Sequence, residues 1–280
     1  MSAQTYQFSL GNFTITMLND LPDETNPVER FFPAATPEER AEIAERYDIT
    51  DELTASHTTM LIQTDTQTIL TDAGWGTHDD GRQGQLLEAL ASIDVQAHDI
   101  DIVILTHAHG DHYLGLLDSD NHKVFPNARY LMHHAEWEYY SSDEYLSQVD
   151  DTRREYMQKH FLPLRDSIDC FGEDNPQIAE GITMLPAYGH TKYHIALEVN
   201  SEGETLIATT DCFIHPMHFL YPHWAWEFEY DKEALEASRK MLIEKILEKN
   251  AIVTAYHFAF PAVGKLTRET EQLIWQPHEA

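Results

Sequence analysis

Residues 106–112 read Thr106-His107-Ala108-His109-Gly110-Asp111-His112, and they directly follow the apolar run Ile100–Leu105. Such a run predicts a buried strand that opens into a loop. The three imidazoles and the carboxylate of this loop suit Zn²⁺ or a similar divalent transition ion. His107 and His109 alternate along an extended chain and point the same way, whereas Asp111 and His112 lie just past them. This spacing predicts two metal ions about 3.5–4 Å apart, the arrangement of a hydrolytic centre that holds a nucleophilic hydroxide.

The alternative interpretation is a histidine-rich loop without a metal. The chain has 17 histidines, so a pair such as His133-His134 can arise by chance. Three histidines and an aspartate at these offsets, directly after a buried strand, are much harder to obtain by chance. The metal site is therefore the favoured interpretation.

The chain is strongly acidic. Its 280 residues include 48 acidic and 18 basic side chains, which gives a formal net charge of −30. Such a surface repels phosphate backbones and anionic lipids, which argues against nucleic acid and membrane partners. The longest apolar runs also fall well short of the roughly 18–20 residues that a membrane span needs. General solubility and adaptation to high salt both remain open as causes of the acidity.

The cysteines and the N-terminus bear on the compartment. Cys170 and Cys212 are the only cysteines, too few for a disulfide scaffold, and two reduced thiols are the expectation. The first eight residues show no basic region followed by an apolar one, so a secretory signal is not expected. A cytoplasmic location follows as the expectation.

Strand-like and helix-like segments alternate along the chain. The predicted strands are Met60–Thr64, Thr68–Asp72, Ile100–Thr106, Ala128–Met132, Gly181–Pro186, His194–Val199, Thr205–Thr210 and Ala251–Tyr256. The predicted helical regions are Gln85–Ile93, about Ala135 to His160, and Asp231–Lys249. Two similar halves of this kind predict an α/β protein, a four-layer αββα sandwich. Residues 1–280 are expected to form a single domain, with segment 20–56, rich in Pro and Glu, as an N-terminal arm or lid.

Two metals need more ligands than residues 107–112 supply. His190, Asp211 and His257 each lie just past a strand-like run. Strand ends converge on one edge of a sheet sandwich, where loops build sites. Asp211 is the only one of the three with a carboxylate that could bridge two cations.

The order His-X-His-X-Asp-His, then His, Asp and His, resembles the metallo-β-lactamase superfamily. The stretch Thr71-Asp72-Ala73-Gly74 also looks like the first motif of that superfamily, an Asp at the end of an early strand. The resemblance runs from about residue 57 to residue 264 and covers five separate motifs. It implies the αββα fold and a site for two metal ions.

Carried over residue by residue, the resemblance implies that His107, His109 and His190 hold one metal. The second would be held by Asp111, His112 and His257, with Asp211 bridging the two ions. Asp72 would not ligate, because in similar proteins this residue supports the metal-binding loop from behind the ligands. Zn²⁺ is the expected metal, although the same ligands also suit Mn, Fe or Co.

Finer similarity favours the lactonase and methyl-parathion-hydrolase-like group of the superfamily. The stretches that carry it are Leu10–Asp20, Phe125–Tyr130, Glu136-Trp137, the region from Asp211 to Arg239, and His257–Gly264. One position departs from the pattern. Some acyl-homoserine lactonases place a Tyr three residues after the bridging Asp, and here that residue is Ile214. The departure weakens signalling-lactone specificity without excluding it.

The resemblance implies a hydrolase in which a metal-bridging hydroxide opens a lactone or small hydrophobic ester, with Asp111 or Asp211 shuttling a proton. The first alternative is an organophosphate triester hydrolase. A β-lactamase and a catalytically decayed metal-binding protein are further alternatives. Fold alone does not choose between these activities.

Aromatic residues crowd the region that follows Asp211. An apolar mouth over the metals would suit a neutral small-molecule substrate. The candidates for a substrate pocket are Phe213, Trp224, Trp226, Phe228 and Trp137, and the competing interpretation is that such residues belong to the core or to an interface. Exposed aromatics and the 20–56 extension would also fit a homodimer.

Overall fold

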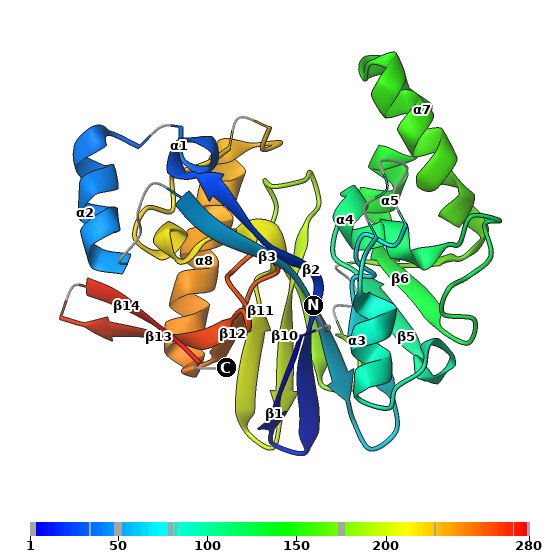
Figure 1. Cartoon of the computed structure of the whole chain (residues 1–280), viewed down its shortest axis with the longest axis horizontal. Helices are drawn as coiled ribbons and strands as arrows, with labels where there is room; N and C mark the ends of the chain where they lie inside the picture. Colours follow the sequence, from blue (N-terminus) through cyan, green and yellow to red (C-terminus); the bar gives the residue numbers. More distant parts are fainter. Residues whose placement is uncertain are drawn as a thin grey trace.

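The computed structural model describes residues 4–33, 35–47, 52–77, 81, 83–172, 177–226, 228–270 and 272–278. Two seven-stranded sheets stand in the middle of this part of the chain, and helices lie outside them (Figure 1). The predicted four-layer αββα sandwich is confirmed. Among these residues, no helix is both long and apolar enough to cross a bilayer.

The first sheet follows the chain order β1-β2-β3-β4-β5-β6-β7. Its strands β4 to β7 run parallel, and β1 to β4 form antiparallel pairs. The predicted strands 60–64 and 68–72 are therefore present within β3 and β4, which form an antiparallel pair. The bounds are β1 Thr5–Leu10, β2 Phe13–Pro27, β3 Glu52–Gln63, β4 Thr68–Thr71, β5 Ile102–Leu105, β6 Arg129–His133 and β7 Ile168–Phe171.

The second sheet has the order β14-β13-β12-β11-β10-β9-β8. Only β11 and β12 pair in parallel, and α8 connects them. The bounds are β8 Gln177–Ala179, β9 Ile182–Pro186, β10 Ile195–Ser201, β11 Glu204–Ala208, β12 Ile252–Thr254, β13 Val263–Glu269 and β14 Gln272–Pro277.

The α-helices are α1 Val28–Phe31, α2 Pro37–Tyr47, α3 Leu86–Ser92, α4 Gly110–Tyr113, α5 His134–Tyr140, α6 Asp143–Gln148, α7 Asp151–His160 and α8 Lys232–Lys249. The short 3₁₀ helices are η1 Ala97–Asp99, η2 Leu114–Leu116, η3 Leu162–Asp166, η4 Thr210–Cys212 and η5 Pro216–Phe219. The helical region expected from about Ala135 to His160 consists of the three helices α5, α6 and α7. Ser142 and Asp150 start new helices there, because their side chains accept hydrogen bonds from backbone N–H groups three residues on.

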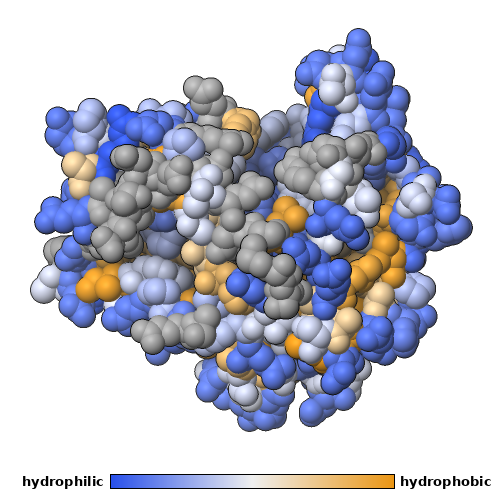
Figure 2. Space-filling view, in the orientation of Figure 1, coloured by the Kyte–Doolittle hydropathy of each residue, from blue (hydrophilic) through white to orange (hydrophobic). Residues whose placement is uncertain are grey.

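Three hydrophobic clusters separate the four layers. On β5, Ile104 packs between the two sheets, whereas its neighbour Leu105 packs toward α3, α5 and α7. On β11, Leu206 likewise faces the space between the sheets, and Ile207 packs toward α8. Central strands are apolar on both faces for this reason, which explains their continuous hydrophobic runs. Hydrophilic residues cover most of the face seen in Figure 2, with hydrophobic residues in separate patches.

Segment 20–56 is partly built into the sheet. Its two ends belong to β2 and β3, which pair with each other as far as Pro27 and Glu52. Between them, Phe32 packs in a fourth cluster with Ile214 and Trp224. The described part of this segment therefore packs against residues that follow Asp211.

Candidate metal centre

The predicted ligands lie just past strand ends. His107 and His109 follow β5, and Asp111 lies in α4. In the second sheet, Asp211 lies in η4 after β11, and His257 follows β12. Because β5 and β11 belong to different sheets, the ligands meet where the corresponding edges of both sheets come together.

The first cluster contains His107, His109, His190 and Asp211. The His190 Nε2 atom lies 2.9 Å from Nδ1 of His109 and 3.3 Å from Oδ2 of Asp211. Nε2 of His107 lies 3.8 Å from the same Asp211 oxygen. Three imidazole nitrogens and one carboxylate oxygen therefore face a common point.

The second cluster contains Asp111, His112, Asp211 and His257. Oδ2 of Asp111 lies 3.6 Å from Nε2 of His112 and 3.5 Å from Nε2 of His257. Asp211 completes the group, with Oδ1 at 3.3 Å from His112 and Oδ2 at 3.1 Å from His257. Asp211 is thus common to both clusters, in the place expected of a bridging ligand.

In the second cluster, the outer nitrogens of both histidines contact other groups. Nδ1 of His112 lies 2.9 Å from Oδ2 of Asp72, and Nδ1 of His257 lies 3.0 Å from the carbonyl oxygen of Ser56. These contacts leave the Nε2 atoms turned toward the clusters, and they fix the orientation of each ring.

Asp72 contacts both the metal-binding loop and one of the cluster histidines. Its Oδ1 accepts hydrogen bonds from the backbone N–H of Thr106 at 2.9 Å and from the Thr106 hydroxyl at 3.1 Å. The residue has a positive φ of 59°, which the turn after β4 imposes. Asp72 therefore ties the start of the metal-binding loop to His112 without belonging to either cluster.

Burial and neighbouring charges shift the pKa values of the cluster histidines in opposite directions. Burial lowers the pKa of His107 and of His109 well below 6.5, and neighbouring imidazoles add to this effect. Burial also acts to lower the pKa of His112, but the carboxylates of Asp211 and Asp72 outweigh it and raise this pKa well above 6.5. The carboxylates thus decide where protons remain when no metal is bound.

His190 behaves like His112. Burial again opposes protonation, but Glu229 and Asp211 raise the pKa of His190 to about 10. The pKa of Asp211 is well below 3.8 because His257 and other imidazoles outweigh its burial. A carboxylate that stays ionised at neutral pH is available to a cation.

The residues present fit two divalent transition ions. Their donor atoms are imidazole nitrogens and carboxylate oxygens, and within each cluster these atoms lie within 4.8 Å of one another. Nε2 of His107 is buried and has no hydrogen-bond partner among the residues that the structure describes. A metal ion in the first cluster would satisfy this nitrogen.

The structure separates the five aromatic pocket candidates. Phe213, Trp224 and Trp137 are buried in three different hydrophobic clusters, with Trp224 only 1% exposed. Their packing is that of core residues, the competing interpretation of the sequence. Trp226 is half-buried, and Phe228 is 66% exposed and packs edge-on against it. Only these two remain candidates to line a mouth.

Several buried residues beside the clusters were not predicted as site residues from the sequence. Glu136 accepts hydrogen bonds from the N–H of Ala108 at 3.0 Å and of Tyr193 at 2.9 Å, so it joins two ligand-bearing loops. His57 places Nε2 3.8 Å from Oδ2 of Asp111. Glu229 contacts His190. These partners lie between 28 and 57 residues away in the chain, so no local spacing could have indicated them.

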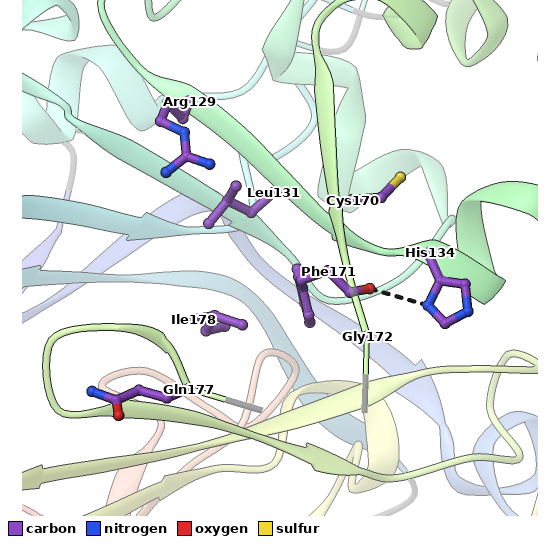
Figure 3. A pocket seen from close by; sticks show the side chains of 8 residues that line it. All are labelled: Arg129, Leu131, His134, Cys170, Phe171, Gly172, Gln177 and Ile178. Carbon is purple, nitrogen blue, oxygen red and sulfur yellow. Dashed lines mark hydrogen bonds between the residues drawn. The ribbon is translucent and has the colours of Figure 1, made fainter. Parts of the chain in front are cut away.

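A cavity of about 570 Å³ opens away from this centre, between the edge strands β7 and β8. Figure 3 shows its lining, with Arg129 at one end and His134 at the other, where Nδ1 of His134 lies 3.2 Å from the carbonyl oxygen of Phe171. None of the eight lining residues belongs to either metal cluster. The chemistry of the centre therefore does not extend to this cavity.

Solved structures resemble the chain over its whole length. AidC, a dizinc quorum-quenching lactonase solved with the product N-hexanoyl-L-homoserine, is 23% identical with a TM-score of 0.85, covering 100% of this chain and 99% of its own. The hydrolase AbOPH is 21% identical with a TM-score of 0.88 and the same coverage. A probable metal-dependent hydrolase from Staphylococcus aureus is 19% identical with a TM-score of 0.78, covering 98% and 99%. At these identities the likeness establishes the fold.

The sequence itself establishes the family of the chain, as well as its fold. No curated protein matches the chain. The sequence model of the metallo-β-lactamase superfamily, however, matches residues 54–255, well over half of the chain, and this stretch contains six of the seven residues in the two clusters. The chain therefore belongs to the metallo-β-lactamase superfamily.

Proposed function

We propose that this metal-dependent hydrolase opens a lactone or a small hydrophobic ester with the help of two divalent metal ions, Zn²⁺ by preference. The observation that carries the proposal is the pair of His/Asp clusters that share Asp211. When bound, two such ions would supply a nucleophile from water and would polarise the carbonyl of the substrate. His107, His109 and His190 would hold one ion, and Asp111, His112 and His257 the other, with Asp211 contacting both.

The two cluster aspartates differ in their access to water. The side chain of Asp111 is 17% exposed, whereas that of Asp211 is 3% exposed. Asp111 is therefore the residue that can pass a proton between the reacting groups and the solvent, and Asp211 is the residue that holds the two halves of the centre together. The hydroxyl of Tyr256 donates to the carbonyl oxygen of Asp111 at 2.6 Å and fixes that residue.

Three observations support a neutral, hydrophobic substrate. AidC, with which the chain shares its fold, was solved with a homoserine product. Phe228 is exposed, packs against Trp226 and directly precedes Glu229, which contacts His190, so we propose that these two aromatic residues supply apolar surface beside the site. With a formal charge of −30, the chain also repels anionic substrates, including nucleic acids. Ile214 is buried against Trp224, so its position offers neither a hydroxyl nor an open surface to the substrate.

The same groups would serve phosphotriester hydrolysis, which is the second candidate. It has the same requirement for two cations and a shared carboxylate. A decayed, non-catalytic protein is disfavoured because all seven cluster residues are in place. The choice between ester and phosphotriester depends on the pocket, where Trp226 and Phe228 are the residues to vary.

The test is a substrate panel with protein reconstituted with Zn²⁺, Mn²⁺ or Co²⁺. Lactones and aryl esters should give higher kcat/KM than phosphotriesters, a chromogenic β-lactam, a charged thioester or a phosphodiester. Asp211→Asn, which disturbs both clusters, should abolish the activity and serves as the control for contaminating esterases. Activity confined to the β-lactam or the phosphodiester would refute the proposed substrate class.

We also propose that the protein acts in the cytoplasm and as a homodimer. Both cysteines are free, as a reducing compartment would keep them. Phe228 and Tyr230, 66% and 46% exposed, would gain from cover by a second copy. Light scattering over a concentration series should give twice the mass of one chain, and a constant monomer mass would contradict the dimer.

A further inference from the structure

Glu229 is a buried carboxylate to which the proposed chemistry assigns no task. It lies just before α8, and its side chain is 0% exposed. Its Oε2 atom lies 2.7 Å from Nδ1 of His190, whose other nitrogen faces Asp211 and His109 in the first cluster. The imidazole of His190 is therefore held between Glu229 on the outside and the cluster on the inside.

The backbone fixes this contact. The N–H of Tyr230 donates to the carbonyl oxygen of His190 at 3.3 Å, and the N–H of Asp231 donates to that of Gly189 at 2.9 Å. Gly189 has a φ of +126°, and a Cβ there would lie 2.2 Å from the backbone nitrogen of Leu235 in α8. The loop that carries His190 is thus packed directly against the start of α8 and the residues that precede it.

Each cluster has one histidine that a carboxylate supports. Asp72 takes this place behind His112 in the second cluster, and Glu229 takes it behind His190 in the first. The outer nitrogens of His257 and His107 instead meet uncharged groups, the Ser56 carbonyl and the Thr106 hydroxyl. A carboxylate behind an imidazole fixes the ring and makes its inner nitrogen a stronger donor to a metal.

A purely structural role explains Glu229 less well. Oε1 of Glu229 is buried and has no hydrogen-bond partner in the described part of the chain. Burying a carboxylate costs free energy unless its oxygens are fully paired, so a neutral side chain of similar size would serve packing better. The single strong contact of Glu229 points instead to the histidine that it touches.

We propose that Glu229 is the positioning residue of the first metal site, which holds His190 with Nε2 directed at the ion. This inference rests on the proposed dimetal function. It makes Glu229 the counterpart of Asp72, with each residue acting on a different ion.

The test measures metal affinity rather than turnover. Metal-free protein is titrated with Zn²⁺ and with Co²⁺ in competition with a chromogenic chelator, for the wild type, Glu229→Gln, Glu229→Ala and Asp72→Asn. Glu229→Ala should weaken one of the two ions by about 10–100-fold and leave the other within about twofold. Glu229→Gln keeps the size and one acceptor oxygen but loses the charge, so its effect should be smaller.

A second pair of variants assigns the ion. In a His257→Ala background, which leaves the first cluster complete, adding Glu229→Gln should weaken the remaining ion, whereas adding Asp72→Asn should not. The visible spectrum of Co²⁺ in that background should shift with Glu229→Gln, because the geometry around the ion changes. Thermal unfolding of the metal-free variants shows whether they fold, and the isosteric Gln variant keeps the test valid if the Ala variant does not.

The outcomes separate the two proposals. A wild-type chain that binds fewer than two ions would overturn the dimetal function and this inference with it. A wild-type chain that binds two ions, with unchanged affinities in folded Glu229→Gln, would overturn only the role of Glu229. Equal weakening of both ions would also overturn it, since a site-specific role would then be absent.

Discussion

Asp20 offers a stability test that does not depend on any metal. It lies at a register shift between β2 and β3 and is fully buried. Its Oδ2 accepts the N–H of Trp75 at 2.8 Å, and its Oδ1 accepts the N–H of Leu86 at 2.9 Å. Burial outweighs these hydrogen bonds and raises the pKa of Asp20 from 3.8 to about 6. The carboxyl group therefore links the turn after β4 to the start of α3 at an electrostatic cost.

The effect of Asp20 on the free energy of unfolding follows from the difference between its pKa in the folded and in the unfolded chain. Between pH 3.8 and about 6 the folded chain binds more protons at Asp20 than the unfolded chain, so stability falls as the pH rises through this window. The full effect is about 3 kcal/mol, and about 2 kcal/mol of it develops between pH 4.5 and 7.5. Asp20→Asn removes this dependence. It also places an amide NH₂ against one of the two N–H donors, which costs about 1–3 kcal/mol at every pH.

The assay is urea unfolding of metal-free wild type and Asp20→Asn at pH 4.5 and 7.5. The variant should be the less stable protein at pH 4.5. Between the two pH values its stability relative to the wild type should improve by about 2 kcal/mol. Matching pH dependence in both proteins, within about 0.5 kcal/mol, would refute the buried, strained carboxyl group. Glu88→Gln on the exposed face of α3 is a matched control that should follow the wild type.

Three further predictions concern the metal loop and the core. Asp111→Asn should lower the bound metal, measured by elemental analysis, from about two ions per chain to about one, and retention of both would contradict its place in the second cluster. Trp224→Ala should cost about 3–5 kcal/mol in urea unfolding, since the side chain is buried, and a loss below about 1 kcal/mol would show that it is not a core residue. Gly115→Ala should destabilise the protein by at least about 1–3 kcal/mol by thermal unfolding, because a Cβ would lie 1.9 Å from the carbonyl oxygen of Ala73.

The fold was predictable where strands are buried on both faces. The strand β5 is apolar throughout, and β11 ends in the buried residues Leu206–Ala208. Predicted ligands follow both strands, so the sequence alone indicated that these strand ends meet at one edge. Helix α8 was equally predictable from the sequence, because Asp231 caps its N-terminus and Asn250 ends it in a left-handed conformation with φ of 49°. The edge strands β7 and β8 were not predicted. They are short and half-exposed, and their pairing depends on neighbours distant in the chain.

The predicted ligands could be recognised from the local sequence, whereas the residues that support them could not. His107, His109 and Asp111 indicate a metal by their spacing alone, because one short loop holds them. Glu136 and Glu229 act through partners in other elements, and a single buried glutamate in a helix or loop carries no local pattern. The aromatic residues could not be divided between a substrate pocket and the core for a related reason, since composition cannot distinguish an apolar rim from an apolar core.

The supporting carboxylates also explain why the centre needs its cations. Asp72, Asp111, Asp211 and Glu229 carry a formal charge of −4 around the two clusters, which two divalent ions would balance while the histidines stay neutral. Without ions, protonated imidazoles offset part of this charge, because these carboxylates raise the pKa of His112 and of His190. A protonated imidazole cannot bind a metal, so each ion must displace protons as it enters. The charge that makes the metal-free centre costly is therefore the same charge that would give it affinity for divalent ions.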